Sequence, residues 1–430
     1  MSANPARLST VRHQSGYHDA ITSERFGCAV LSSLICAAAI SIGTAQNLPA
    51  DRPFGDHVSF RLDKAKLRST PAAAALLDGL AENPYLYFRM LARQYSARTC
   101  FEFRDLRWRL PSAGVHGDPH IEQFVTTANS YGLEDFDLAG FGPAVVDLVR
   151  YAASIHLTCR QASWSCNADE AVATYFNAYH AALDHPVTRT QPRVVARLRA
   201  AAPIDQLDWL QWATSLMRPL PGDQEQEFRR GWQRFVQLMR DAYPDRPETF
   251  FHIERLGALQ IGVGSGLEAK ILIRIAGPTV GAEDDVILEV RPTRTSDGTE
   301  CVSRPTHGGS MQVMMFEALL GPRLPEVVGF LPREGAREAP ELWVQSWDPG
   351  YRELSIANLQ SQTELNELAL DAATQLAGYF WTTFPEPLRA HQRFAQLRAF
   401  EMTSTRAQQA AREFARETIT EWERFRRAPK

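Results

Sequence analysis

Val115-His116-Gly117-Asp118-Pro119-His120-Ile121-Glu122-Gln123-Phe124 is the stretch on which our interpretation of this chain rests. A second acidic stretch, Glu134-Asp135-Phe136-Asp137, follows shortly after it. Carboxylates, histidines and glycines crowd together in this part of the sequence, whereas apolar runs are few. A buried strand or helix does not require that composition, but a site that handles a proton and a metal ion does.

The composition of the whole chain is that of an ordinary soluble globular protein. Of its 430 residues, 44% are hydrophobic and 22% are charged, and this length allows two or three lobes around a large core. The formal net charge of −4 and the pI near 6.3 give no electrostatic footprint for nucleic acid. We therefore expect no nucleic-acid partner.

An uncharged run at residues 26–45 stands apart from this composition. It is rich in small residues, follows Arg25 and ends at Gly43-Thr44-Ala45-Gln46, which resembles a signal-peptidase site. We favour an export signal or membrane anchor, with membrane contact only through this run; otherwise the chain would be cytoplasmic. A mis-assigned start codon and a buried helix are the alternatives. Export would conflict with a role that uses ATP.

The six cysteines form no metal or redox motif. They are Cys28, Cys36, Cys100, Cys159, Cys166 and Cys301, and no pair has the C-x-x-C spacing. Cys159 and Cys166 could pair in an oxidising compartment, but the sequence favours buried free thiols.

Hydrophobic periodicity divides the chain into four regions. They are a leader and tether (1–55), a catalytic-loop and helical region (56–250), a β-rich lobe (251–350) and C-terminal helices (351–430). Helices are predicted at 59–80 with a break near Pro71, from Pro84 to Arg93, at 143–161, through most of 167–250, at 310–321 and from 363 onward, where 405–427 is charged and external. Strands are predicted at 101–115, at 133–136 as its partner, and at 256–263, 270–276, 286–291 and 341–345.

The acidic stretches suggest a proton acceptor beside a metal ion. A carboxylate at Asp118, in a glycine-containing turn after a strand, can accept the proton of a substrate hydroxyl. Gln123 can make a second contact, and a short loop and return strand would bring Asp135 beside Asp118. Two carboxylates with an amide between them suit Mg²⁺ with the phosphates of a nucleotide and do not suit zinc.

The β-rich lobe supplies matching parts. Gly262-Val263-Gly264-Ser265-Gly266 joins two predicted strands, and its backbone could approach phosphates closely. Lys270 or Arg291, on the following strands, could hold the phosphate charge. Glycine loop, basic strand residue and two aspartates are the parts of the phosphoryl-transfer template. Here the catalytic parts precede the glycine loop, which is the order of a circularly permuted kinase-like fold.

These motifs resemble two groups of proteins. The His-Gly-Asp-x-His pattern with a later Asp-Phe-Asp is similar to the aminoglycoside and choline phosphotransferase branch of the protein-kinase-like superfamily. More closely, the chain resembles the bacterial "domain of unknown function 2252" family over roughly residues 60 to 385. The matching motifs are Asn83-Pro84 through Arg89, Gly117 through Phe124, Glu134 through Asp137, Gly142-Pro143 through Arg150, and Gly262 through Ser265.

The resemblance implies an α+β, protein-kinase-like two-lobe fold, circularly permuted and with a large helical portion. It also implies ATP and Mg²⁺ as cofactors. Residue by residue, it implies Asp118 as the catalytic base, Asp135 as the Mg²⁺ ligand with Gln123 at the position of a metal-binding Asn, and Asp137 and Asp147 as residues that orient the loop. Arg150 would be an ion-pair partner, and Gly262, Gly264 and Ser265, with the adjacent Gly266, would cover the phosphates. We count Asp137 among the candidate metal ligands as well.

The sequence departs from the family pattern at several positions. Gln123 replaces the metal-binding Asn, Arg291 replaces a strand lysine, and Glu134 replaces the Asn before Asp-Phe-Asp. The late Ala-His-Ala has become Gly378-Tyr379-Phe380-Trp381, without the histidine, and Glu317 is the only carboxylate in its predicted helix.

Structural roles compete with several of these assignments. His116 and His120, which we place beside Asp118 as catalytic candidates, are also candidates for loop anchors bonded to backbone. Asp147 and Arg150 share a helix face and are expected to form a structural ion pair, and Arg89 is expected to be solvated or ion-paired. A tight hairpin explains the glycine loop equally well.

Three functions are compatible with these residues. The first is a phosphotransferase that binds ATP and Mg²⁺ and uses Asp118 on the hydroxyl of an unknown small molecule or protein. The second is a degenerate kinase fold that binds a nucleotide or a partner without turnover. The third, a metal-dependent phosphoesterase, ranks last because no downstream Gly-Asn-His follows.

Overall fold

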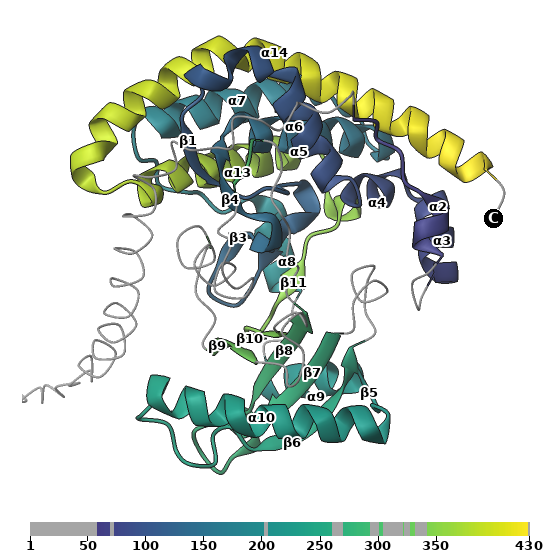
Figure 1. The fold of residues 1–430 in the computed structure, drawn as a ribbon, viewed down its shortest axis with the longest axis vertical. Coiled ribbons are helices and arrows are strands. Elements are labelled where there is room, and N and C mark those ends of the chain that lie inside the picture. Colours follow the sequence, from purple (N-terminus) through teal and green to yellow (C-terminus); the bar gives the residue numbers. More distant parts are fainter. Residues whose placement is uncertain are drawn as a thin grey trace, which may run out of the picture. The chain divides into compact units, whose positions relative to one another are not determined.

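The computed structural model describes residues 58–68, 73–201, 205–259, 270–292, 301–303, 321, 327–331 and 342–428. By their contacts the residues divide into two units, Met1–Ala50 and Asp51–Lys430. The description that follows concerns the second unit, which is a mixed α+β structure (Figure 1). The apolar run 26–45, the glycine loop 262–266 and residues 310–320 of the predicted helix at 310–321 lie outside the described residues.

The largest sheet has six antiparallel strands. Its order is β5 (Met217–Arg218), β6 (Ile253–Leu259), β7 (Lys270–Ile275), β8 (Val286–Pro292), β10 (Leu342–Ser346) and β9 (Val328–Leu331). The strands predicted at 256–263, 270–276, 286–291 and 341–345 correspond to β6, β7, β8 and β10.

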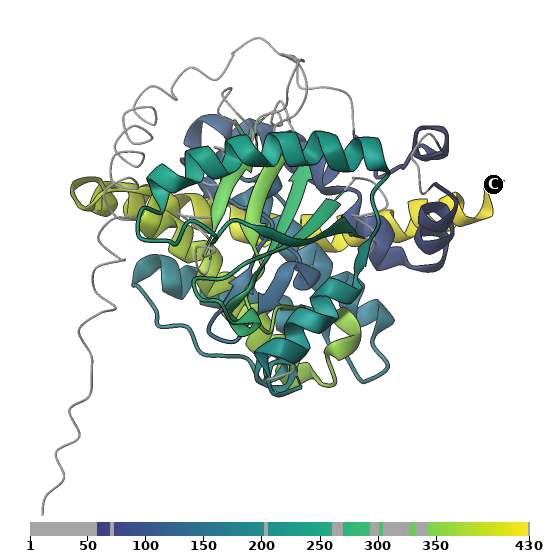
Figure 2. The ribbon, with the colours of Figure 1, turned by 90° about the horizontal axis from the view of Figure 1, so that it is seen from below.

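Two helices cover opposite faces of this sheet because side chains alternate along each strand. On one face, α10 (Gly222–Ala242) packs its aromatic residues against Ile273, Leu288 and Val290. On the other face, α9 (Gln206–Ser215) packs against Leu272 and Ile287. Figure 2 shows α10 crossing the strands. Glu289 and Arg291 follow Ile287 at alternate positions, so they lie on the α9 face.

The helical part surrounds α6 (Val145–Gln161), which is buried along most of its length. The helices that contact it are α4 (Pro84–Arg89), α5 (Ala92–Glu102), α7 (Ala168–Asp184) and α14 (Glu386–Arg427), and α13 (Gln362–Thr383) packs along α7. Asn83 caps α4 by accepting hydrogen bonds from the backbone N–H groups of Tyr85 and Leu86, as its Asn-Pro start suggests.

The remaining elements are short. They are α2 (Lys64–Leu67), α3 (Ala73–Glu82), α8 (Arg193–Ala200), the 3₁₀ turns η1 (Arg104–Arg109), η2 (Ile121–Gln123), η3 (Phe136–Leu138), η4 (Ala282–Asp284) and η5 (Ile356–Asn358), and the strands β1 (Ser112–Val115), β2 (Phe124–Thr126), β3 (Tyr131–Leu133), β4 (Gly140–Pro143) and β11 (Arg352–Glu353). The strands pair as β1–β4 and as β11–β2–β3.

Several predicted elements differ from the observed ones. Residues 101 and 102 end α5 and do not begin a strand, because their aromatic neighbours pack inward from a helix. The partner of β1 is β4, whereas the strand at 131–133 pairs with β2. The charged C-terminal helix begins at Glu386, well before 405, and one of its faces is buried.

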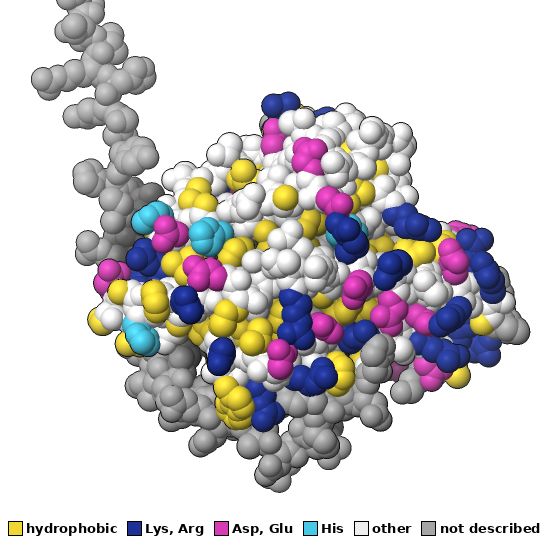
Figure 3. Space-filling model, turned by 90° about the horizontal axis from the view of Figure 1, so that it is seen from above, with side chains coloured by type: hydrophobic (Ala, Val, Ile, Leu, Met, Phe, Trp, Pro, Cys, Tyr) yellow, Lys and Arg dark blue, Asp and Glu magenta, His cyan; other side chains and the backbone are white. Residues whose placement is uncertain are grey.

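The exposed face of α14 carries charges of both signs. Figure 3 shows Lys and Arg side chains interspersed with Asp and Glu over this part of the surface. Arg406 bridges α14 to Glu102 and Asp105, with distances of 3.3 and 3.0 Å. No helix in the described ranges is long and apolar enough to cross a membrane.

The expected free thiols are a wrong prediction. Cys159 pairs with Cys166 and Cys100 pairs with Cys301, with Cα–Cα distances of 5.2 and 5.5 Å. The first pair closes the turn after α6. The second joins residues 201 positions apart, and sequence spacing could not reveal it.

Candidate functional site

The His116 turn is fixed by the first turn of α6. The carboxylate of Asp147 accepts hydrogen bonds from the backbone N–H groups of His116 (2.7 Å) and Gly117 (2.9 Å). Gly117 has a φ of +83°, and a Cβ there would lie 2.0 Å from the carbonyl oxygen of Leu138. The turn therefore requires glycine, and it presents Asp118 immediately after β1.

Arg150 pairs with Asp118, so the expected ion pair between Asp147 and Arg150 is wrong. Nε of Arg150 donates to Oδ1 of Asp118 at 2.8 Å, and Nη2 lies at the same distance from that oxygen. The guanidinium also donates to the carbonyl oxygen of Phe88 and stacks 3.6 Å from the centre of its ring. Asp147 instead binds the backbone N–H groups of the turn that carries Asp118.

One carboxylate oxygen of Asp118 is available to accept a proton. Its Oδ2 makes no hydrogen bond to any described residue, although the residue as a whole is only 9% exposed. Burial raises the pKa of this carboxyl to about 6, and the charge of Arg150 limits the rise. At neutral pH the group is therefore mostly ionised yet basic enough to accept a proton.

The two histidines beside Asp118 differ in their contacts. His116 hydrogen-bonds the carbonyl oxygen of Glu134 through Nε2 (2.9 Å), as expected of a loop anchor, and burial lowers its pKa to about 4. His120 is 1% exposed, burial holds its pKa well below the usual range, and its Nδ1 has no hydrogen-bond partner in the described part of the chain. A buried polar nitrogen without a partner is unusual and indicates an unfilled contact.

Arg89 has a partner of its own. Its Nη1 lies 3.2 Å from Oε2 of Glu122, and Oε1 of Glu122 accepts hydrogen bonds from the hydroxyl of Ser355 and from the backbone N–H of Ile356. The ion-paired state expected for Arg89 is the observed one. This pair ties α4 to the stretch that follows His120.

The Asp135 loop meets the β-rich lobe through Arg291. Asp135 has a φ of +68°, and no other non-glycine residue in the described ranges has a positive φ. Its Oδ1 accepts from Nη1 of Arg291 (3.2 Å), and its Oδ2 accepts from Nε2 of Gln123 (3.3 Å). Arg291 also contacts both carboxylate oxygens of Asp137, at 3.0 Å each.

Glu289 is a site residue that sequence analysis missed. It is 6% exposed, lies 2.9 Å from Nζ of Lys270, accepts a hydrogen bond from the indole of Trp347 and lies 4.0 Å from Nε of Arg291. Burial alone would raise its pKa, but Lys270 and Arg291 outweigh burial and lower it. The available signal was a glutamate inside an apolar strand, where acidic residues are rarely buried without a partner.

Sequence analysis also missed a hydrogen bond at Glu134, the residue before Asp135. The hydroxyl of Tyr351 donates to Glu134 (2.9 Å), and burial raises the pKa of Glu134 to about 7. The stretch Gly378-Tyr379-Phe380-Trp381, which lacks the family's histidine, lies in α13, where Tyr379 and Phe380 are buried. The centre of the Tyr379 ring lies 6.2 Å from that of Phe136. These residues support the loop from the helical side.

The residues expected to bind Mg²⁺ do not fit that ion in this arrangement. The carboxylate oxygens of Asp135 and Asp137 already accept from Arg291 and Gln123, and Gln123 presents its amide nitrogen and not its oxygen. No cluster of three or more His, Cys, Asp or Glu side chains suited to a metal occurs within the described ranges. Mg²⁺ requires several oxygen ligands around it, and here a guanidinium takes that position.

The structure thus brings together most of the predicted site residues that it describes. Asp118, His116, Gln123, Asp135, Asp137 and Arg291 lie within one connected set of contacts, and Lys270 joins it through Glu289. His120 interacts with His116 through charge. Gly262, Gly264, Ser265 and Gly266 lie outside the described residues, as does Glu317.

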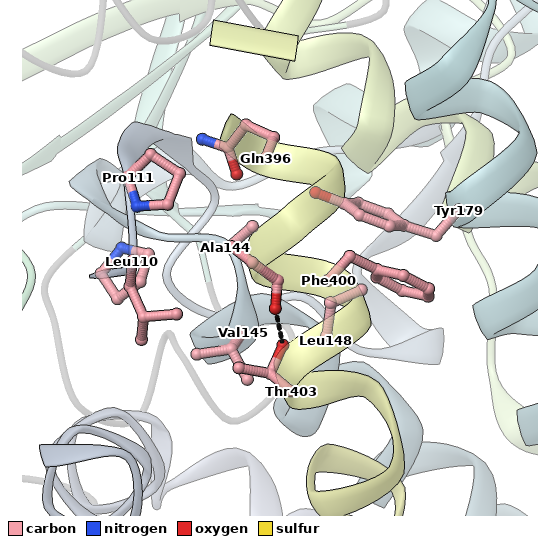
Figure 4. Close-up of a pocket in the computed structure, with 11 residues that line it drawn as sticks. Leu110, Pro111, Ala144, Val145, Leu148, Tyr179, Gln396, Phe400 and Thr403 are labelled. Carbon is pink, nitrogen blue, oxygen red and sulfur yellow. Dashed lines mark hydrogen bonds between the residues drawn. The ribbon is translucent and has the colours of Figure 1, made fainter. Parts of the chain in front are cut away.

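Two cavities lie apart from this set of contacts. Figure 4 shows a small cavity between the start of α6, Tyr179 of α7 and Gln396 to Thr403 of α14. Its volume of about 20 Å³ has room for a single water molecule. A wider groove of about 630 Å³ runs along α10, lined by Arg229, Trp232 and His252.

Comparison with known proteins places part of the chain in a described family model. No curated protein and no solved structure matches the chain. Residues 71–208 match the model of a family described as "Uncharacterized protein conserved in bacteria (DUF2252)", a segment that contains β1, the Asp118 turn, the Asp135 loop and α6. The chain is therefore similar over this segment to the bacterial DUF2252 family, as its motifs indicate.

Proposed function

We propose that this chain is a kinase-like phosphotransferase, with the catalytic loop before the glycine loop, in which Asp118 accepts the proton of an acceptor hydroxyl. The observation that carries the proposal is the state of Asp118. One oxygen is held by a buried arginine, the other has no partner among the described residues, and the pKa is about 6.

Each neighbour of Asp118 has a part in this proposal. Arg150 fixes Oδ1, so the proton would be taken by Oδ2, whose direction is then set by the buried guanidinium. His120 is neutral at physiological pH, and its buried ring, which packs against Tyr85 and Phe88, would hold the turn that carries Asp118. A positioned general base of this kind contributes about 10²–10⁴-fold to a rate.

Lys270 fits the contact with a nucleotide's phosphates. Its ammonium is held by Glu289, and although burial opposes charge, Glu289 keeps the pKa of Lys270 above its usual value. The lysine therefore stays charged at the start of β7, a few residues after the predicted glycine loop in the sequence. A bound nucleotide would supply the phosphoryl group at this side of the site.

ADP formation by the full chain tests the proposal. The assay would use ATP with a panel of hydroxyl-bearing small molecules and Ser/Thr peptides, at a pH above that of the Asp118 transition. Asp118→Asn is expected to lower the rate by about 10²–10⁴-fold while leaving stabilisation by the nucleotide intact. Asp285→Asn is the matched control, because Asp285 is a buried aspartate paired with Arg274 away from the site.

A second function is favoured by Arg291. Because this arginine engages Asp135 and Asp137, the chain would bind a nucleotide without turning it over. Nucleotide-dependent stabilisation with no ADP formation above that of Asp118→Asn would support this function and contradict the first. Absence of any stabilisation by ATP would contradict both.

A further inference from the structure

We infer that Arg291 is a built-in cation for Asp135 and Asp137, so that this acidic pair binds no divalent metal ion until the arginine is removed. The inference rests on the proposed function only in taking the acidic pair as the place where a phosphotransferase would need a cation. It makes a claim about metal binding that holds with or without turnover.

The geometry supports a fixed arginine. Nη1 and Nη2 of Arg291 lie 3.0 Å from the two carboxylate oxygens of Asp137, and Nη1 also lies 3.2 Å from Oδ1 of Asp135. A planar guanidinium that bonds a carboxylate through two parallel N–H groups is held in orientation as well as by charge. The Arg291 side chain is 8% exposed and that of Asp137 is 15% exposed, so solvent screens their contact weakly, whereas the Asp135 side chain is 42% exposed and its contact is screened more.

The sheet keeps the arginine in place. Arg291 pairs with Trp343 across β8 and β10, which sets its position in the strand. Glu289, two residues earlier on the same face, adds a further negative group 4.0 Å from Nε. The guanidinium thus lies among the carboxylates of Asp135, Asp137 and Glu289, which favours this position over a displaced one.

Charge explains what the arginine changes. With Arg291 present, Asp135 and Asp137 together with the arginine carry a net charge of −1. Without it the pair carries −2, and the amide of Gln123 can rotate to present its oxygen. Two carboxylates and an amide oxygen are ligands that Mg²⁺ and Mn²⁺ accept. Removing Arg291 should thus create a divalent site from residues that are already adjacent.

Mn²⁺ binding to the full chain without nucleotide tests the inference, read from the loss of the free-ion EPR signal. Wild type is expected to bind Mn²⁺ only weakly and non-specifically. Arg291→Met, which keeps the side-chain bulk without charge, is expected to bind Mn²⁺ at least about tenfold more tightly, a difference of about 1.4 kcal/mol. Asp137→Asn in the Arg291→Met background should abolish the gain.

Arg406→Met is the matched control. Arg406 also bridges two carboxylates, Glu102 and Asp105, but Asp105 is exposed and Glu102 is only half-buried, on the turn after α5 and on α5. Its removal changes the net charge equally and is expected to leave Mn²⁺ binding at the wild-type level. A gain equal to that of Arg291→Met would show a charge effect and overturn the inference.

Two further results would overturn it. One is Mn²⁺ binding by wild type that disappears in Asp135→Asn, a measurement that decides the question even if Arg291→Met does not fold. The other is a folded Arg291→Met that gains no binding. Neither depends on ADP formation, so failure here is distinct from failure of the phosphotransferase proposal.

Discussion

The two aspartate–arginine pairs of the site differ in what they leave available. Arg150 approaches Asp118 from a fully buried position on α6 and contacts one oxygen. Arg291 approaches from β8 and contacts oxygens of both Asp135 and Asp137. The first pairing leaves an oxygen that can accept a proton, whereas the second neutralises the carboxylates that a metal would need.

The difference arises from the elements that carry each arginine. Arg150 is enclosed by aromatic rings, with Phe88 at 3.6 Å and Tyr95 at 4.7 Å, so its donors are restricted to Asp118 and backbone carbonyls. Arg291 lies at the end of a strand, next to a loop that crosses from the helical part. The same residue types therefore serve as a positioning pair in one place and as a neutralising pair in the other.

Of the changes that test this comparison, removal of Arg150 should lower the free energy of unfolding the most. Arg150→Met leaves a buried aspartate without its cation, and loss of one partner of a buried ion pair costs about 3–5 kcal/mol. The free energy of unfolding, from urea denaturation, is the measurement. Arg229→Met, which breaks an exposed pair with Glu225, should cost about 0.3–0.5 kcal/mol. Equal losses in the two variants would contradict the burial argument.

The Cys100–Cys301 disulfide should affect the Arg291 pairing and leave the Arg150 pairing unchanged. Cys301 lies ten residues after Arg291, and the nearby Ser303 pairs with Phe141 of β4, so the bond ties residues 301–303 to α5 and β4. By chain entropy, Cys301→Ser should be about 3 kcal/mol more destabilising than Cys166→Ser, whose bond closes a far shorter loop.

The matched experiment compares urea denaturation of both variants under oxidising conditions. Because only the Cys100–Cys301 bond lies near Arg291, its loss should weaken the contacts of Arg291 with Asp135 and Asp137. Cys301→Ser should therefore bind Mn²⁺ more tightly than Cys166→Ser. Equal free energies of unfolding in the two variants would contradict the chain-entropy argument for the Cys100–Cys301 bond.

Much of the fold could be predicted from local pattern. The Asn83-Pro84 start of α4, the helix after Pro143 and the strands β6, β7, β8 and β10 follow from capping residues and apolar periodicity. The proximity of Asp135 to Asp118 was also predicted. The mixed α+β class followed from the same patterns, while the kinase-like arrangement remains a proposal.

The errors share a physical origin in contacts between distant residues. Asp147 and Arg150 lie three apart on α6, yet the first binds the loop at residues 116 and 117 and the second binds Asp118. The partner of β1 was misassigned because a return strand at 140–143 competes with a nearer one. The Cys100–Cys301 bond and the role of Glu289 required the tertiary structure.

The pH dependence of ADP formation tests most directly the central claim that Asp118 is the reactive partner of the two pairs. Because the ionised carboxylate accepts the proton, the rate should rise with pH, with an inflection near the pKa of about 6, and level off above it. The inflection should be absent in Asp118→Asn and present in Asp285→Asn. A rate that does not depend on pH around 6, or an unchanged profile in Asp118→Asn, would contradict the account.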